Sequence, residues 1–221
     1  MLDRVVGKFD STRRLWPVSA RLSLWLALEL AILTFVGLTA PRPDLETQLG
    51  NLRYALELST LLSMGTLAAV LALRSAIPGR EATRNELLMI STLAMVAVAL
   101  VWGESQPPVR LDQFMQKGIK CVGCETLLAA LPWFVLFWAV RRGAPLVAGT
   151  AGGLVGLAAF SFAFAATRLG CPIDSPLHLL TWHVLPLAVG TCVSALLGIA
   201  WLQSRAWTGP RRHIFPDDLL D

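Results

Sequence analysis

The chain has 221 residues, of which 55% are hydrophobic and only 15% are charged, and its mean hydropathy is +0.60. A soluble globule of this size needs more polar surface, so the composition excludes an ordinary soluble protein and predicts a membrane protein. The formal net charge of +4 indicates affinity for anionic lipid rather than for nucleic acid, because no soluble domain is left to bind nucleic acid directly.

Apolar windows of roughly the length that a spanning helix needs recur along the whole chain. There are six, at residues 22–38, 55–73, 87–102, 126–140, 146–167 and 179–202. We therefore expect an all-α integral membrane bundle of six transmembrane helices. The first window follows basic residues, as a signal peptide does, but it is longer than a typical signal-peptide core and contains Glu29. An uncleaved first helix is the prediction.

The basic residues between the windows divide unequally between the two sides of the membrane. One side holds thirteen of the nineteen: Arg4, Lys8, Arg13, Arg14, Arg21, Arg74, Arg80, Arg84, Arg141, Arg142, Arg205, Arg211 and Arg212. The other holds six: Arg42, Arg53, Arg110, Lys117, Lys120 and Arg168. By the positive-inside rule both termini are cytoplasmic. We expect a cytoplasmic amphipathic segment at 1–20, a transmembrane domain at 21–204 and a cytoplasmic tail at 205–221.

Six potential metal ligands fall on the opposite, extracytoplasmic side: Cys121, Cys124, Cys171, Asp174, His178 and His183. The two thiols of the C-x-x-C pair share a helix face at i, i+3, as Asp174 and His178 do at i, i+4 if the helix begins that early. Sulfur and imidazole ligands suit copper, zinc or cadmium. Thiols in an oxidising compartment can also be redox sensors, here Cys121, Cys124 and Cys171.

Simpler interpretations of the same residues stay open. The three cysteines on that side can form a structural disulfide, with or without a spare thiol. His178 and His183 flank Trp182, a pattern typical of side chains that anchor a protein at the headgroups. Cys192 is expected to be a small packing residue.

Other polar and small residues within the windows suggest structural roles. Glu29 is expected to be protonated and hydrogen-bonded between helices, although an ionisable group at membrane depth is also a functional candidate. Glu57 is expected to pair with Arg53, one turn away. Four glycines of the fifth window permit close helix packing: Gly149, Gly152, Gly153 and Gly156.

The N-terminal segment carries one apolar stripe, made of Leu2, Val5, Val6 and Phe9 at i, i+3, i+4 and i+7. Such a short amphipathic helix either lies on the membrane or docks into a partner.

Several stretches resemble the NrsF family of membrane anti-sigma factors, which are negative regulators of extracytoplasmic-function (ECF) sigma factors. They are "RRLWPVSAR", "PGR" at 78–80, "LLAALPWFVLFWAVRRGAP" after a cysteine, the glycine-rich fifth window and "GCPIDSPLHLLTWHVLP". The resemblance implies a six-helix bacterial inner-membrane protein that holds a cytoplasmic ECF sigma factor inactive and releases it on a periplasmic signal.

The resemblance also implies two periplasmic sensing cysteines, one before the fourth helix and one before the sixth. The second corresponds to Cys171, and the first is either Cys121 or Cys124. His183 stands where the family has a tyrosine, and can add an imidazole to the sensor. We expect Cys171 to lie near at least one of the two other thiols, and Cys124 to matter more than Cys121, which is placed farther out in a polar loop.

Two functions from different classes follow. The first is a non-enzymatic sensor that requires no cofactor, binds the sigma factor through Leu2, Val5, Val6 and Phe9, and responds to a transition-metal ion or an oxidant. The second is a membrane thiol-disulfide oxidoreductase linked to quinone, because a C-x-x-C pair at the end of a helix bundle also suits thiol exchange.

Overall fold

The computed structural model describes residues 15–103 and 111–202, without the side chains of residues 112 and 113, and this part of the chain is all helical. Six stretches are long and apolar enough to cross a membrane, which confirms the predicted fold class. They are α2 (Val18–Thr39), α4 (Leu52–Ser75), α5 (Arg84–Trp102), α6 (Leu111–Arg141), α7 (Ala148–Gly170), and a last one built from α8 (Pro176–Leu179), η1 (Leu180–Val184) and α9 (Leu185–Leu202). A short α3 (Leu45–Leu49) follows α2.

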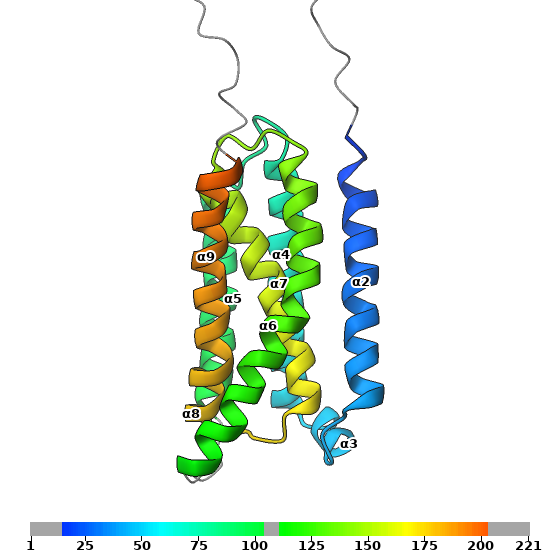
Figure 1. The fold of residues 1–221 in the computed structure, drawn as a ribbon, viewed down its shortest axis with the longest axis vertical. Helices are drawn as coiled ribbons and strands as arrows, with labels where there is room; N and C mark the ends of the chain where they lie inside the picture. Colours follow the sequence, from blue (N-terminus) through cyan, green and yellow to red (C-terminus); the bar gives the residue numbers. More distant parts are fainter. Residues whose placement is uncertain (1–14, 104–110, 203–221) are drawn as a thin grey trace, which may run out of the picture.

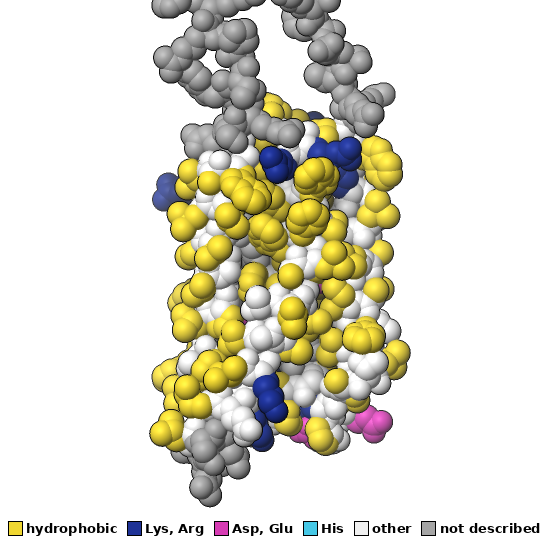
Figure 2. Space-filling view, in the orientation of Figure 1, with side chains coloured by type: hydrophobic (Ala, Val, Ile, Leu, Met, Phe, Trp, Pro, Cys, Tyr) yellow, Lys and Arg dark blue, Asp and Glu magenta, His cyan; other side chains and the backbone are white. Residues whose placement is uncertain are grey.

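The long helices run side by side along one axis (Figure 1). Helix α2 begins and α9 ends at the same end of the bundle, which we call the terminal end; α3 and the α7–α8 connection lie at the opposite end, which we call the α3 end (Figure 1). The flanks between the two ends are largely hydrophobic, and Lys and Arg side chains gather near the ends (Figure 2). Hydrophobic flanks of this length suit lipid rather than water, so the chain is a multi-pass membrane protein.

Helix α7 is the centre of the bundle and packs against α2, α4, α6 and α9. Its spanning window is 78% buried, against 11% for the first and the last span. Small residues allow this, as predicted for the glycines: a Cβ placed on Gly152 would lie 2.4 Å from the carbonyl oxygen of Ser194 and 2.8 Å from the Cα of Gly198. The two backbones therefore touch, as at other small-residue contacts in membranes.

Hydrogen bonds between helices fix this packing. The Ser194 hydroxyl donates to the Gly152 carbonyl at 2.5 Å and accepts from the Trp133 indole at 2.8 Å, which joins α6, α7 and α9. The buried indole of Trp25 donates to the Pro132 carbonyl at 3.0 Å and joins α2 to α6. In lipid such bonds satisfy groups that water cannot reach.

Several sequence expectations about local structure are wrong. Helix α6 begins at Leu111 rather than near residue 126. The prediction missed its first turns because they carry polar residues such as Lys117 and Lys120, and the predicted window included only the apolar run. The condition for a shared helix face of Asp174 and His178 is not met, because α8 begins at Pro176 and Asp174 precedes it.

Two acidic residues also differ from expectation. Glu57 is fully buried and pairs with Arg168, not with Arg53. Arg53 instead donates to the carbonyl of Leu100 at 2.9 Å, near the end of α5. Glu29 is buried on α2, and its Oε1 has no hydrogen-bond partner among the described residues.

Candidate metal and redox centre

Four side chains from different elements converge at the α3 end of the bundle. Cys121 lies on α6, Cys171 directly follows α7, His178 lies on α8 and His183 lies in η1. One ligand atom from each lies within 4.8 Å of the other three. Cys171 and both histidines are buried, while Cys121 is half-buried. We call these four residues the Cys2His2 cluster.

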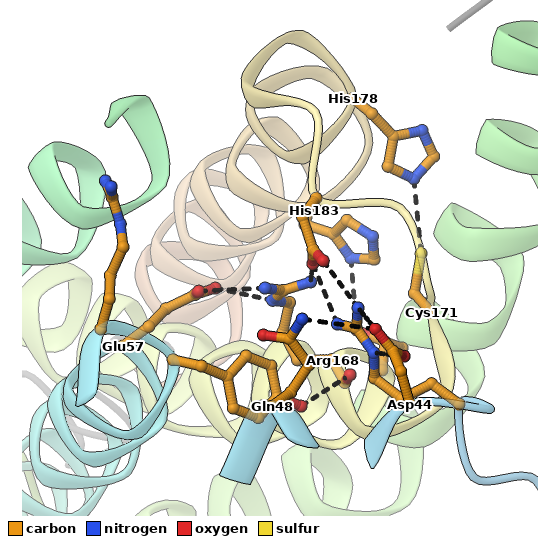
Figure 3. A network of polar contacts seen from close by, with 12 residues as sticks. Asp44, Gln48, Glu57, Arg168, Cys171, His178 and His183 are labelled. Carbon is orange, nitrogen blue, oxygen red and sulfur yellow. Dashed lines mark hydrogen bonds and ion pairs between the residues drawn. The ribbon is translucent and has the colours of Figure 1, made fainter. Parts of the chain in front are cut away.

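Within this cluster the contacts are close. The Sγ atoms of Cys121 and Cys171 are 3.7 Å apart, and the Nε2 atom of His178 lies 3.7 Å from the first and 3.6 Å from the second. Figure 3 shows the His178 ring aimed at the Cys171 sulfur. No disulfide joins the thiols, and all four cysteines are free. The expected proximity of Cys171 to one thiol of the C-x-x-C pair is therefore present, but the thiol is Cys121.

The distances match what one tetrahedral ion would impose. Two sulfurs at about 2.3 Å from a zinc ion lie about 3.8 Å apart, and a sulfur and an imidazole nitrogen lie about 3.6 Å apart. Thiolate and imidazole are also the ligands that soft and borderline ions such as Cu⁺, Zn²⁺ and Cd²⁺ prefer. The donor set and these three distances thus fit a four-coordinate metal site.

A π-helical turn explains how both histidines reach the site. His178 and His183 are five positions apart, which in a regular α-helix would place them roughly 140° apart around the axis. The wider turn of the π-helix η1, which is closed by i→i+5 hydrogen bonds, brings the fifth residue back toward the same side. The two rings lie 5.6 Å apart between centroids. A search for i, i+3 and i, i+4 pairs misses such a pairing.

Glu125 is a functional candidate that sequence reasoning missed. Its Oε2 lies 2.8 Å from Nδ1 of His183, which also contacts the Thr167 hydroxyl at 3.2 Å. Both members of the Glu125–His183 pair are completely buried. With Nδ1 held by the carboxylate, Nε2 of His183 has no partner among the described residues and keeps its lone pair for a metal. The sequence feature that could have identified Glu125 is its position as an acidic residue one helical turn after Cys121, at the start of an apolar run.

Two further thiols lie outside this cluster. Cys124 is exposed, but it lines a cavity of about 210 Å³ together with Cys121 and Cys171. This cavity lies between α2, α6 and the end of α7 and gives access to the cluster. Cys121 lies within α6 rather than in a polar loop, so the reason for ranking it below Cys124 is wrong. Cys192 is exposed on α9, so the packing role expected for it is also wrong.

Asp174 lies next to the cluster but is occupied by two arginines. Its Oδ1 accepts from Arg168 at 2.7 Å and from Arg42 at 2.9 Å, and its Oδ2 accepts from Arg42 at 2.6 Å. Burial would raise the pKa of Asp174, but the hydrogen bonds and positive charges of the arginines outweigh it, so the pKa lies below its usual value. Asp174 is thus held as an anion by salt bridges to Arg42 and Arg168.

The salt bridges continue beyond Asp174, and Figure 3 shows Arg168 paired with Glu57. Arg168 also pairs with Glu57 of α4 at 2.8 Å, and Arg42 with Asp44 at 2.7 Å. Hydrogen bonding to Arg42 lowers the pKa of Asp44 to about 2. These five residues, which we call the salt-bridge network, tie the segment after α7, and hence Cys171, to the connection between α2 and α3 and to α4.

A family model described as NrsF, negative regulator of sigma F, matches residues 10–203, which confirms the resemblance seen in the sequence. Neither the curated proteins nor the solved structures contain a match to the chain.

Proposed function

Because the chain belongs to the NrsF family of negative regulators of sigma F, we propose that it is a membrane anti-sigma factor whose Cys2His2 cluster detects the signal. In this proposal it holds an ECF sigma factor at the cytoplasmic face of the bacterial inner membrane and acts without catalysis. Residues Leu2, Val5, Val6 and Phe9, proposed to bind the sigma factor, lie outside the described residues.

The observation that carries the proposal is the spacing of the four donor atoms, all within 4.8 Å of one another and drawn from three helical spans. An ion bound there attracts α6, the end of α7 and the α8–η1 segment to one point. A state of the bundle in which these parts fit the ion is favoured over one in which they do not. The signal therefore changes the relative stability of two helix packings, and the other packing releases the sigma factor.

Oxidation of the same thiols is the alternative signal. Cys121 and Cys171 would each lose one electron and one proton to an oxidant such as hypochlorite, and a disulfide would form between them. Their sulfurs are 3.7 Å apart and would have to approach to about 2.05 Å. The disulfide would consume both thiolate ligands, so oxidation and metal binding exclude each other at this site.

The proposed orientation places the α3 end in the periplasm and the terminal end in the cytoplasm. It follows from the positive-inside rule applied to the loops. The charges at the α3 end give further support, because Arg42 and Arg168 are both neutralised by buried carboxylates there. Thiols at the α3 end would then be exposed to periplasmic metals and oxidants.

Ion binding to the purified protein in lipid nanodiscs tests the proposal. We expect one Zn²⁺ or Cd²⁺ per chain in the reduced protein, and its loss in Cys121→Ser, Cys171→Ser and His178→Ala. Cys192→Ser, which changes a thiol remote from the cluster, is the matched control. The co-purified sigma factor should dissociate on addition of the ion or of hypochlorite. A complex that withstands all of these treatments, or ion binding unchanged in the three variants, would refute the proposal.

A further inference from the structure

Another cavity lies at the terminal end, at the opposite end of the bundle from the Cys2His2 cluster. It has a volume of about 710 Å³, is open to the outside, and is lined by the start of α2, the turn between α4 and α5, and the turn between α6 and α7. The two turns are joined, since the backbone N–H of Ala144 donates to the carbonyl of Ala76 at 2.9 Å. Gly143 makes this approach possible, because a Cβ there would lie 2.1 Å from the same carbonyl oxygen. The walls are thus part of the fixed bundle.

Arg21 lines this cavity, and two of its hydrogen-bond donors have no partner among the described residues. Its Nη1 donates to the carbonyl of Ala139 at 3.3 Å, while Nε and Nη2 are buried without a partner among the described residues. Buried donors of a guanidinium are costly to leave unpaired. Nε and Nη2 together form an edge of the guanidinium that suits a carboxylate in bidentate geometry. Arg142 adds a second positive charge on another wall of the cavity.

The other charges near this end do not neutralise the two arginines. Arg74 is the partner of Glu86 at 2.5 Å. Glu81 accepts from the backbone N–H of Gly79 at 3.0 Å. Neither carboxylate lines the cavity, whose remaining lining is mainly apolar and includes Trp16, Ile77 and Pro78. Among the described residues, the cavity therefore combines apolar walls with two cationic groups and no acidic side chain.

We propose that this cavity receives an acidic side chain of the sigma factor, with apolar neighbours of that side chain resting on Trp16, Ile77 and Pro78. This inference rests on the proposed function, since it requires the terminal end to be cytoplasmic. The chain itself indicates a protein occupant: residues 1–14, whose apolar stripe is the proposed sigma-binding segment, lead directly into the cavity wall at Leu15. A sigma factor held by that segment is tethered within fourteen residues of the cavity, and one of its carboxylates would pair with Arg21.

Binding measurements on the full-length protein in nanodiscs test the inference. The sigma factor is titrated against the wild type, Arg21→Gln, Arg142→Gln and the control Arg84→Gln, an exposed arginine at the same end that does not line the cavity. Loss of a charge-assisted hydrogen bond predicts Kd values raised about tenfold to a hundredfold for Arg21→Gln. Arg142→Gln, which is exposed and leaves the packing intact, should raise Kd by a smaller factor, and Arg84→Gln should leave it unchanged.

A charge swap and a change of lipid complete the test. An acidic-to-lysine change in the sigma factor should restore binding to Arg21→Glu and weaken binding to the wild type. The titrations are repeated in nanodiscs of phosphatidylcholine alone and of phosphatidylcholine with phosphatidylglycerol. If Arg21→Gln binds the sigma factor like Arg84→Gln but loses stabilisation by phosphatidylglycerol, the cavity holds a lipid headgroup and the inference is wrong. If the wild type fails to bind any sigma factor, the proposed function itself fails.

Discussion

Glu125 and His183 are 58 positions apart in the chain, yet the carboxylate Oε2 and the imidazole Nδ1 meet at 2.8 Å in a completely buried pair. This contact occupies Nδ1 of His183 and leaves Nε2 as the ring nitrogen without a partner among the described residues. It also raises the electron density of the ring, as carboxylates do for metal-bound histidines. The pair therefore connects the metal site to α6 through a residue that does not itself belong to the Cys2His2 cluster.

The first prediction concerns this carboxylate. Glu125→Gln retains the shape of the side chain but removes its charge, so His183 becomes a weaker ligand. Affinity for Zn²⁺ or Cd²⁺ should fall about tenfold to a hundredfold, measured by competition with a chelator of known affinity. Glu46→Gln, an exposed carboxylate on α3, is the control. Equal affinities in the two variants would mean that Glu125 has only a structural role.

The second prediction separates the two thiols of the C-x-x-C pair. Cys121→Ser should abolish both ion binding and sigma-factor release, as Cys171→Ser should, because their sulfurs lie 3.7 Å apart in the cluster. Cys124→Ser should retain ion binding, since Cys124 is exposed and lies only on the access cavity. Thiolate-to-metal charge-transfer absorption of the Cd²⁺ complex reports the ligands directly. A complex that loses this band in Cys124→Ser but keeps it in Cys121→Ser would reverse the assignment.

The third prediction tests the contact between α7 and α9. In Gly152→Ala the new methyl group would lie 2.4 Å from the Ser194 carbonyl oxygen, whereas in Gly153→Ala the nearest atom is the Ala195 Cβ at 3.5 Å. The first variant should lose about 1–3 kcal/mol of stability through overpacking, and the second should behave like the wild type. Thermal unfolding in a mild detergent measures the difference. Equal midpoints would show that the helices separate without cost.

The membrane helices were predictable because hydropathy is a local property. The second window, 55–73, lies within α4 (Leu52–Ser75), and no distant residue was needed to find it. The start of α6 was missed because its lysines interrupt the apolar run, although the helix continues through them. The glycines of α7 also indicated close packing correctly, since only small residues allow two backbones to touch.

The details of the site could not be read in the same way. Cys121 and Cys124 are three positions apart, and the rotation of α6 decides which of them faces Cys171. That rotation is set by packing along the whole helix rather than by the motif. The π-turn before His183 departs from α-helical spacing. The pairing of Arg168 with Glu57 joins residues 111 positions apart, and a local pattern instead favoured Arg53.

The fourth prediction concerns the charge balance of the salt-bridge network. Asp174→Asn leaves the guanidinium groups of Arg42 and Arg168 without the buried carboxylate that lies between them. Removing one partner of a buried salt bridge costs about 3–5 kcal/mol, so the variant should unfold at a markedly lower temperature. Asp44→Asn, at the half-exposed side of Arg42, should cost much less. Similar losses in the two variants would show that burial does not govern the network.

The final prediction is the pH dependence that the same carboxylates produce. The pKa of Asp44 is lowered to about 2 by its hydrogen bond from Arg42, and the pKa of Asp174 is also below its usual value. A carboxylate with a lowered pKa in the folded state stabilises the fold above its unfolded pKa of about 3.9, and this contribution is lost as the pH falls toward the folded value.

These carboxylates should therefore leave the unfolding temperature of the detergent-solubilised protein unchanged above about pH 5. Between about pH 4 and pH 2 their protonation should lower it. The unfolding temperature of Asp174→Asn should be lower at neutral pH and should fall less between about pH 4 and pH 2, because one of the two titrating carboxylates is absent. Parallel curves for the variant and the wild type would assign the acid sensitivity to other groups.

Because Cys171 lies three residues before Asp174 in the same segment, acid loss of the salt-bridge network should also weaken retention of a bound Cd²⁺ ion, which dialysis at each pH measures.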